Sequence, residues 1–95
     1  MNFNYERLVV DQEPCHILFS SEIYPVLLKT GMTVSADVIV QIGKMRNDRS
    51  LIVAPLSLAK PLVLLMEENG GRLTGVEVWI YKSGPEKTSA YVVED

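Results

Sequence analysis

Apolar and polar side chains alternate most regularly over residues 33–42. Val34, Ala36, Val38, Val40 and Ile42 fall on one side of this segment, and mostly polar residues fall on the other. A period of two is typical of a β-strand that buries one face. Similar but shorter runs predict further strands over residues 3–10, 15–19, 51–54, 73–81 and 89–93. The polar residues 11–14 would join the first two strands as a hairpin.

The segment 20–30 is compatible with a helix or a strand. Ser21 could cap a short helix with Pro25 in its first turn, and this is the favoured interpretation. Val26, Leu27 and Leu28 could equally continue as a strand.

A second ambiguous segment covers residues 57–69. A helix here would gather four apolar residues on one side, namely Leu58, Leu62, Leu65 and Met66. A strand from residue 62 could instead turn back through Asn69 and Gly70, which suit a tight hairpin turn. Glu67 and Glu68 would lie against the negative end of a helix dipole, so strand, turn, strand is favoured.

Length and composition limit the fold class. The chain has 95 residues, of which 47% are hydrophobic and 22% are charged, as expected for one folded domain over residues 1–95. The predicted fold is mainly β, a small barrel or sandwich of five to seven strands with one short helix. An α+β domain with two helices on a sheet is the alternative.

Charge and cysteine content exclude several classes of protein. The net charge of −3 argues against a general binder of phosphate backbones, which normally carries a basic surface. Cys15 is the single cysteine, so no disulfide can form within the chain. No apolar run approaches the roughly 20 residues of a membrane span, and the N-terminal residues do not resemble a secretory signal. The expected location is therefore cytoplasmic.

No catalytic constellation is evident. Cys15 and His16 are neighbours on a predicted strand, so their side chains should point to opposite faces and could not exchange a proton directly. Gly70 and Gly71 lack the spacing of a nucleotide-binding motif. We therefore expect no enzymatic activity, no metal site and no cofactor.

The best candidates for binding residues are a basic segment and two aromatic residues. Residues 43–49 are expected to form a solvated loop, in which Lys44, Arg46 and Arg49 could converge on a phosphate or an acidic partner. Trp79 and Tyr81 belong to a strand with bulky residues on both faces, more than a domain of this size readily buries. The predicted function is a non-catalytic module that contacts another protein or a second copy of itself. The alternative is an anionic-ligand or nucleic-acid binder that uses residues 43–49.

Residues 27–58 carry a family resemblance. The stretch LLKTGMTVSADVIV, followed by Gly43-Lys44 and by LIVAPLSL, resembles the β-barrel segment of periplasmic adaptor subunits, or membrane fusion proteins, of bacterial efflux and secretion pumps. In that family a Leu-x-Pro-Gly-Met-x-Val stretch enters a barrel strand, a basic hairpin follows, and the next strand ends in Val-Pro. Thr30 stands where the family usually has proline. The resemblance implies barrel architecture and nothing about an intact adaptor.

Overall fold

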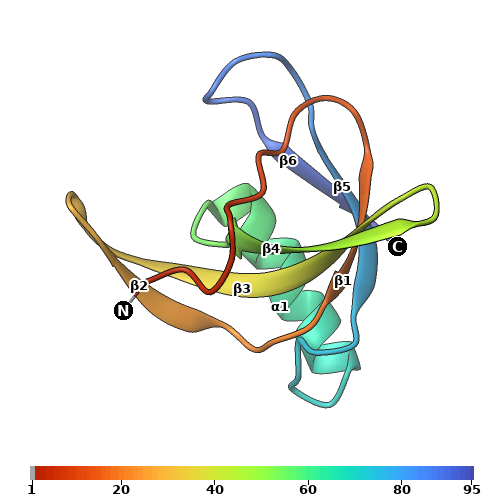
Figure 1. The fold of residues 1–95 in the computed structure, drawn as a ribbon, viewed down its shortest axis with the longest axis horizontal. Coiled ribbons are helices and arrows are strands. Elements are labelled where there is room, and N and C mark those ends of the chain that lie inside the picture. Colours follow the sequence, from red (N-terminus) through yellow and green to blue (C-terminus); the bar gives the residue numbers. More distant parts are fainter. Residues whose placement is uncertain (1) are drawn as a thin grey trace.

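Six strands and one helix make up residues 2–95 of the computed structural model (Figure 1). In chain order they are β1 (Cys15–Phe19), β2 (Tyr24–Leu28), β3 (Gly31–Ile42), β4 (Met45–Ile52), α1 (Leu56–Glu68), β5 (Glu77–Lys82) and β6 (Tyr91–Glu94). The prediction of a mainly β fold with one helix is confirmed, although the helix does not lie in the segment favoured for it.

The long strand β3 organises the sheet. β2 pairs with its first half and β1 with its second half along one edge, while β4 pairs along the opposite edge. β1 also pairs with β5, which in turn pairs with β6, and all these pairings are antiparallel. The sheet is not closed into a barrel, because β4 and β6 at its two ends do not pair within the part of the chain described. The edge of β4 is instead used by the N-terminal segment, where Ser50 N–H donates to the carbonyl of Glu6 and Leu8 N–H donates to the carbonyl of Ser50.

The hydrophobic core lies between the inner face of the curved sheet and α1. β3 contributes Ala36, Val38 and Val40, which are all buried, as the alternation over residues 33–42 predicts. β1, β5 and α1 also contribute core side chains, namely Ile17, Phe19, Val78, Ile80, Leu58 and Leu62, and Leu51 of β4 and Leu73 are buried with them. The N-terminal segment covers the outer face of the sheet around Asp37 and Ser50, which are buried. The outer face is exposed around Gln41 and Trp79, and this part is left for other contacts.

Residues 56–68 form a helix, so the strand and hairpin favoured for this segment are wrong. Burial of Leu58 and Leu62 against the sheet provides a stabilisation that outweighs the unfavourable placement of two glutamates in the last turn. The helix ends where Gly71 N–H donates to the carbonyl of Met66, and both Gly70 and Gly71 adopt positive φ.

Within residues 2–95, α1 is the one helix, and it is too short to span a membrane.

The helix favoured for residues 20–30 is also wrong, because this segment contains β2. Ser21 does not cap a helix, since its hydroxyl accepts a hydrogen bond from the backbone N–H of Asp37 on β3. Pro25 is tolerated because β2 is an edge strand that pairs with β3 on one side only.

Other segments also differ from the prediction, and the strand predicted over residues 73–81 begins only at Glu77 as β5. Residues 43–49 are not a loop, because only Gly43 and Lys44 form the turn between β3 and β4. β4 begins at Met45, which pairs with Ile42 at the end of the long strand β3. Residues 3–10 do not form the predicted strand and do not pair with β1 as a hairpin. Instead, the N-terminal segment crosses the sheet (Figure 1), and Arg7 makes a single parallel bridge to Ser50 of β4.

Candidate functional site

The register of the sheet aligns side chains from five strands on its outer face. Gln41 of β3 lies opposite Arg46 of β4 and opposite His16 of β1, and His16 lies opposite Trp79 of β5. Trp79 in turn lies opposite Glu94 of β6. These residues alternate with the buried ones of the core, so they face outward. We call them the outer row: Arg46, Gln41, His16, Trp79 and Glu94.

Trp79 is the largest exposed side chain of the outer row. It is 46% exposed, and its ring centroid lies 5.1 Å from that of His16 with the rings tilted by 59°. His16 Nε2 lies 3.6 Å from the Oε2 atom of Glu77, which helps to orient the imidazole. A shallow hollow of about 360 Å³ lies between His16, Gln41, Gly43 and Trp79. The indole ring of Trp79 thus contacts the imidazole of His16 and remains partly open to solvent, as expected for an anchor residue of a binding surface.

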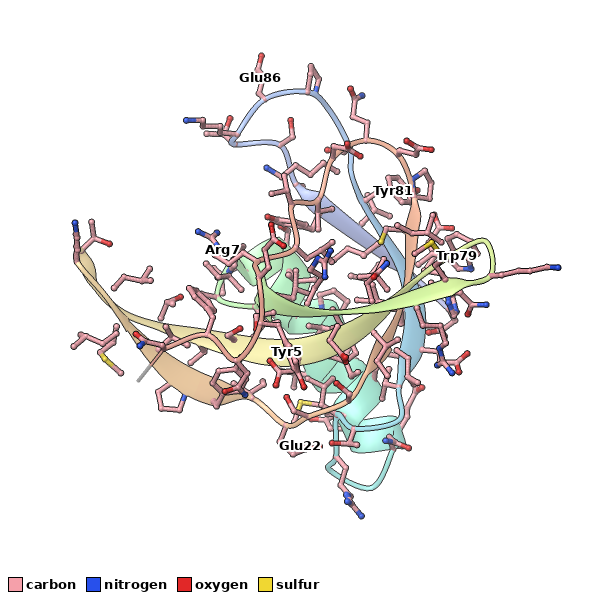
Figure 2. All side chains as sticks on the ribbon, viewed as in Figure 1. Tyr5, Arg7, Glu22, Trp79, Tyr81 and Glu86 are labelled. Carbon is pink, nitrogen blue, oxygen red and sulfur yellow. The ribbon has the colours of Figure 1, made fainter. Side chains whose placement is uncertain are left out.

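Tyr81 shares the outward orientation of Trp79, because it is two residues further along β5. Its hydroxyl donates to the Oε1 atom of Glu94 at 2.6 Å. This hydrogen bond is the main reason that the pKa of Tyr81 is raised. Figure 2 shows Trp79 and Tyr81 on the same part of the sheet, with Trp79 beside the β3–β4 turn.

The three predicted cations do not converge. Arg46 belongs to the outer row, and Lys44 lies in the turn just beyond it. Arg49 is three residues after Arg46 on the same strand and so points to the other face, where its Nη1 donates to the carbonyl of Asp48. The surface around Trp79 is therefore flanked by two of the predicted cations.

Carboxylates lie among these cations. Along the next row of the outer face, Asp48 of β4 aligns with Ile39 of β3, and Glu77 of β5 aligns with Leu18 of β1. Glu94 ends the outer row itself. The face thus carries both signs of charge, which suits a partner with complementary charges of both signs better than a polyanion.

Cys15 and His16 lie on opposite faces of β1, as predicted. Cys15 is half-buried and packs against the core, whereas His16 faces outward beside Trp79. Burial, and secondarily the charge of Asp11, raise the pKa of the Cys15 thiol. Across residues 2–95 there is also no group of three side chains placed to hold a metal ion.

A second polar cluster lies where the N-terminal segment crosses the sheet. The carboxylate of Asp37, which is 5% exposed, accepts hydrogen bonds from the Tyr24 hydroxyl, the Ser50 hydroxyl and the Asn4 amide. Tyr5 N–H donates to Ser50 Oγ at 3.0 Å. Because its donors and acceptors satisfy one another, the cluster fastens the N-terminal segment to the sheet.

The sequence indicated Trp79, Tyr81 and Arg46 as candidate binding residues but did not indicate the other members of the outer row. Gln41, His16 and Glu94 carry no motif, and only the strand register brings them to Trp79. The polar cluster around Asp37 was equally undetectable, because its members come from four separate segments.

Comparison of the chain with protein-family models, with curated proteins and with solved structures gave no match. The resemblance of residues 27–58 to periplasmic adaptor subunits stays a prediction. In the structure these residues form the end of β2, all of β3 and β4, and the start of α1. They belong to an open sheet rather than to a barrel.

Proposed function

We propose that this chain is a non-catalytic protein-binding module and that the outer row, with Tyr81 and Lys44 beside it, is its binding surface. The observation that carries the proposal is the half-exposed Trp79, packed against His16 at the edge of a hollow. Trp, Tyr and Arg are the residue types that most often dominate the binding energy of protein interfaces, and this face presents one of each.

The spacing of the outer row favours an extended partner. Arg46 and Trp79 are three strands apart, a distance of about 14 Å at the usual separation of neighbouring strands. A single small ion cannot touch both, whereas an extended segment of about four or five residues spans that distance. The fitting partner segment carries an apolar or aromatic side chain for Trp79 and a carboxylate for Arg46 or Lys44.

The experiment is selection of random displayed peptides on the wild-type chain. Binding of the selected peptides is followed by the fluorescence of Trp79, the only tryptophan in the chain, and by calorimetry. We expect binding to weaken by about tenfold or more in W79A and in R46E. W79A removes the central anchor, and R46E reverses the charge that would pair with a carboxylate of the peptide. L27A removes a similarly exposed apolar side chain from β2 and serves as the matched control. Equal peptide binding by W79A and the wild type would refute the proposal.

Nucleic-acid or anionic-ligand binding is the second candidate, because Lys44 and Arg46 flank an exposed aromatic ring. Its disadvantages are the net charge of −3 and the carboxylates of Asp48, Glu77 and Glu94 on the same face. Titration with single-stranded and duplex oligonucleotides at low salt tests it. Identical affinity of the wild type and the K44A/R46A/R49A variant would remove this candidate.

A further inference from the structure

The helix α1 has a second apolar side that faces away from the core. Leu58 and Leu62 are buried on its inner side. Its outward stripe has the spacing of one helix face and consists of Leu56, Ala59, Lys60, Val63 and Leu64, which together line one surface depression. Leu56 is 71% exposed, Leu64 is 61% exposed and Val63 is 49% exposed. A helix that is apolar on both sides is normally covered on both.

Charged residues on the same helix indicate what covers this stripe. Lys60 lies within the stripe, and Glu67 follows seven residues later on the same side of the helix. Within residues 2–95, neither Lys60 nor Glu67 lies within 4 Å of an oppositely charged group. The last turn of α1 contains Glu67 and Glu68 but no basic residue, so the negative end of the helix dipole is uncompensated.

We propose that the outward stripe is covered by the same stripe of a second copy of this chain, with the two helices antiparallel about a two-fold axis. If the axis passes between Val63 and Leu64, each Lys60 meets the partner's Glu67, and this contact occurs twice. At the axis, Val63 of each copy then meets Leu64 of the other copy. Each helix also gains a cation near its C-terminal end, where its own chain supplies none.

Other occupants fit the stripe less well. A parallel pair about a two-fold axis would set each Lys60 beside the partner's Lys60, an unfavourable contact. An anionic membrane surface is opposed by the net charge of −3 and by the two glutamates of the last turn. The contact of one 13-residue helix is small, so a dimer that dissociates in the micromolar range or above is expected. This proposal concerns the side of α1 that faces away from the sheet, and it does not depend on the outer row.

Analytical ultracentrifugation from low micromolar to millimolar concentration tests the proposal. We expect a concentration-dependent dimer of the wild type, and dissociation constants raised about tenfold or more in K60E and in E67K, because each places like charges in both symmetric contacts. K29E makes the same change of charge in the β2–β3 turn and should leave dimerisation unchanged. Circular dichroism confirms that each variant is folded.

A charge exchange separates this geometry from any other mode of association. An equimolar mixture of K60E and E67K should form mixed dimers more tightly than either variant pairs with itself, and the double variant K60E/E67K should recover dimerisation. A wild type that stays monomeric at millimolar concentration overturns the proposal. So does a dimer whose affinity is the same in K60E, in E67K and in their mixture.

Discussion

The carboxylate of Glu22 accepts hydrogen bonds from both the backbone N–H and the hydroxyl of Thr74, which lies 52 positions further along the chain. The backbone N–H of Leu73 donates to the same carboxylate at 2.9 Å. These contacts fasten the connection between β1 and β2 to the loop that follows α1. The hydrogen bond from the Thr74 hydroxyl, followed by those from the two backbone N–H groups, lowers the pKa of Glu22 to about 2.

The first prediction is a pH-dependent stability contribution from Glu22. Because its pKa is lower in the folded chain than in the unfolded chain, the ionised carboxylate stabilises the fold above its ordinary pKa, and this contribution is lost as the pH falls toward 2. We expect E22Q to lower the free energy of unfolding at pH 7 by about 1 kcal/mol or less, since the group is exposed to solvent. Urea unfolding should show the difference from wild type shrinking between about pH 4.5 and pH 2. E86Q, in the exposed β5–β6 loop, is the control, and a difference for E22Q that does not change with pH would contradict the assignment.

The second prediction concerns the buried carboxylate of Asp37. D37A leaves the hydroxyls of Tyr24 and Ser50 and the amide of Asn4 without their shared acceptor. We expect a loss of about 2 to 3 kcal/mol in the free energy of unfolding. Asp48 is an exposed carboxylate on the adjacent strand, and D48A should change stability by less than about 0.5 kcal/mol. Equal urea midpoints for the two variants would show that the cluster contributes nothing to stability.

The third prediction contrasts the two sides of α1. Leu62 is 1% exposed and Leu64 is 61% exposed. L62A should destabilise the chain by about 2 to 5 kcal/mol, because it opens a cavity between the helix and the sheet. L64A should change the stability of the monomer by less than about 0.5 kcal/mol. Thermal unfolding at low protein concentration measures both, and a large loss in the L64A monomer would place that side chain in the core.

The fourth prediction is a slow reaction of Cys15 with alkylating reagents. Its pKa is raised chiefly by burial, so less thiolate is present near neutral pH than for a free thiol. Alkylation by iodoacetamide should be at least about tenfold slower in the native chain than in the same chain in urea. D11N removes the smaller of the two causes and should alter the native rate by no more than about twofold. A native rate equal to that of the unfolded chain would indicate an activated or fully accessible thiol.

Local pattern alone was sufficient for some elements. The alternation over residues 33–42 predicted β3 and the burial of Ala36, Val38 and Val40, because a period of two places one face of a strand against the core. Val34 and Ile42, at the two ends of the same face, are exposed. The same period-two geometry predicted that Cys15 and His16 lie on opposite faces of β1. Trp79 was predicted as a binding candidate because its strand carries bulky residues on both faces, more than a domain of this size readily buries. In the structure Trp79 is 46% exposed.

Tertiary contacts decided the rest. Leu58 and Leu62 fit a helix or a strand equally well by composition, and burial against the sheet selected the helix. Residues 46–49 are all polar, yet they form part of β4 because β3 offers a long partner edge, which local propensity does not reveal. The outer row depends on register: it joins His16 to Trp79, 63 positions apart in the chain, and a shift of one residue would turn either side chain to the opposite face.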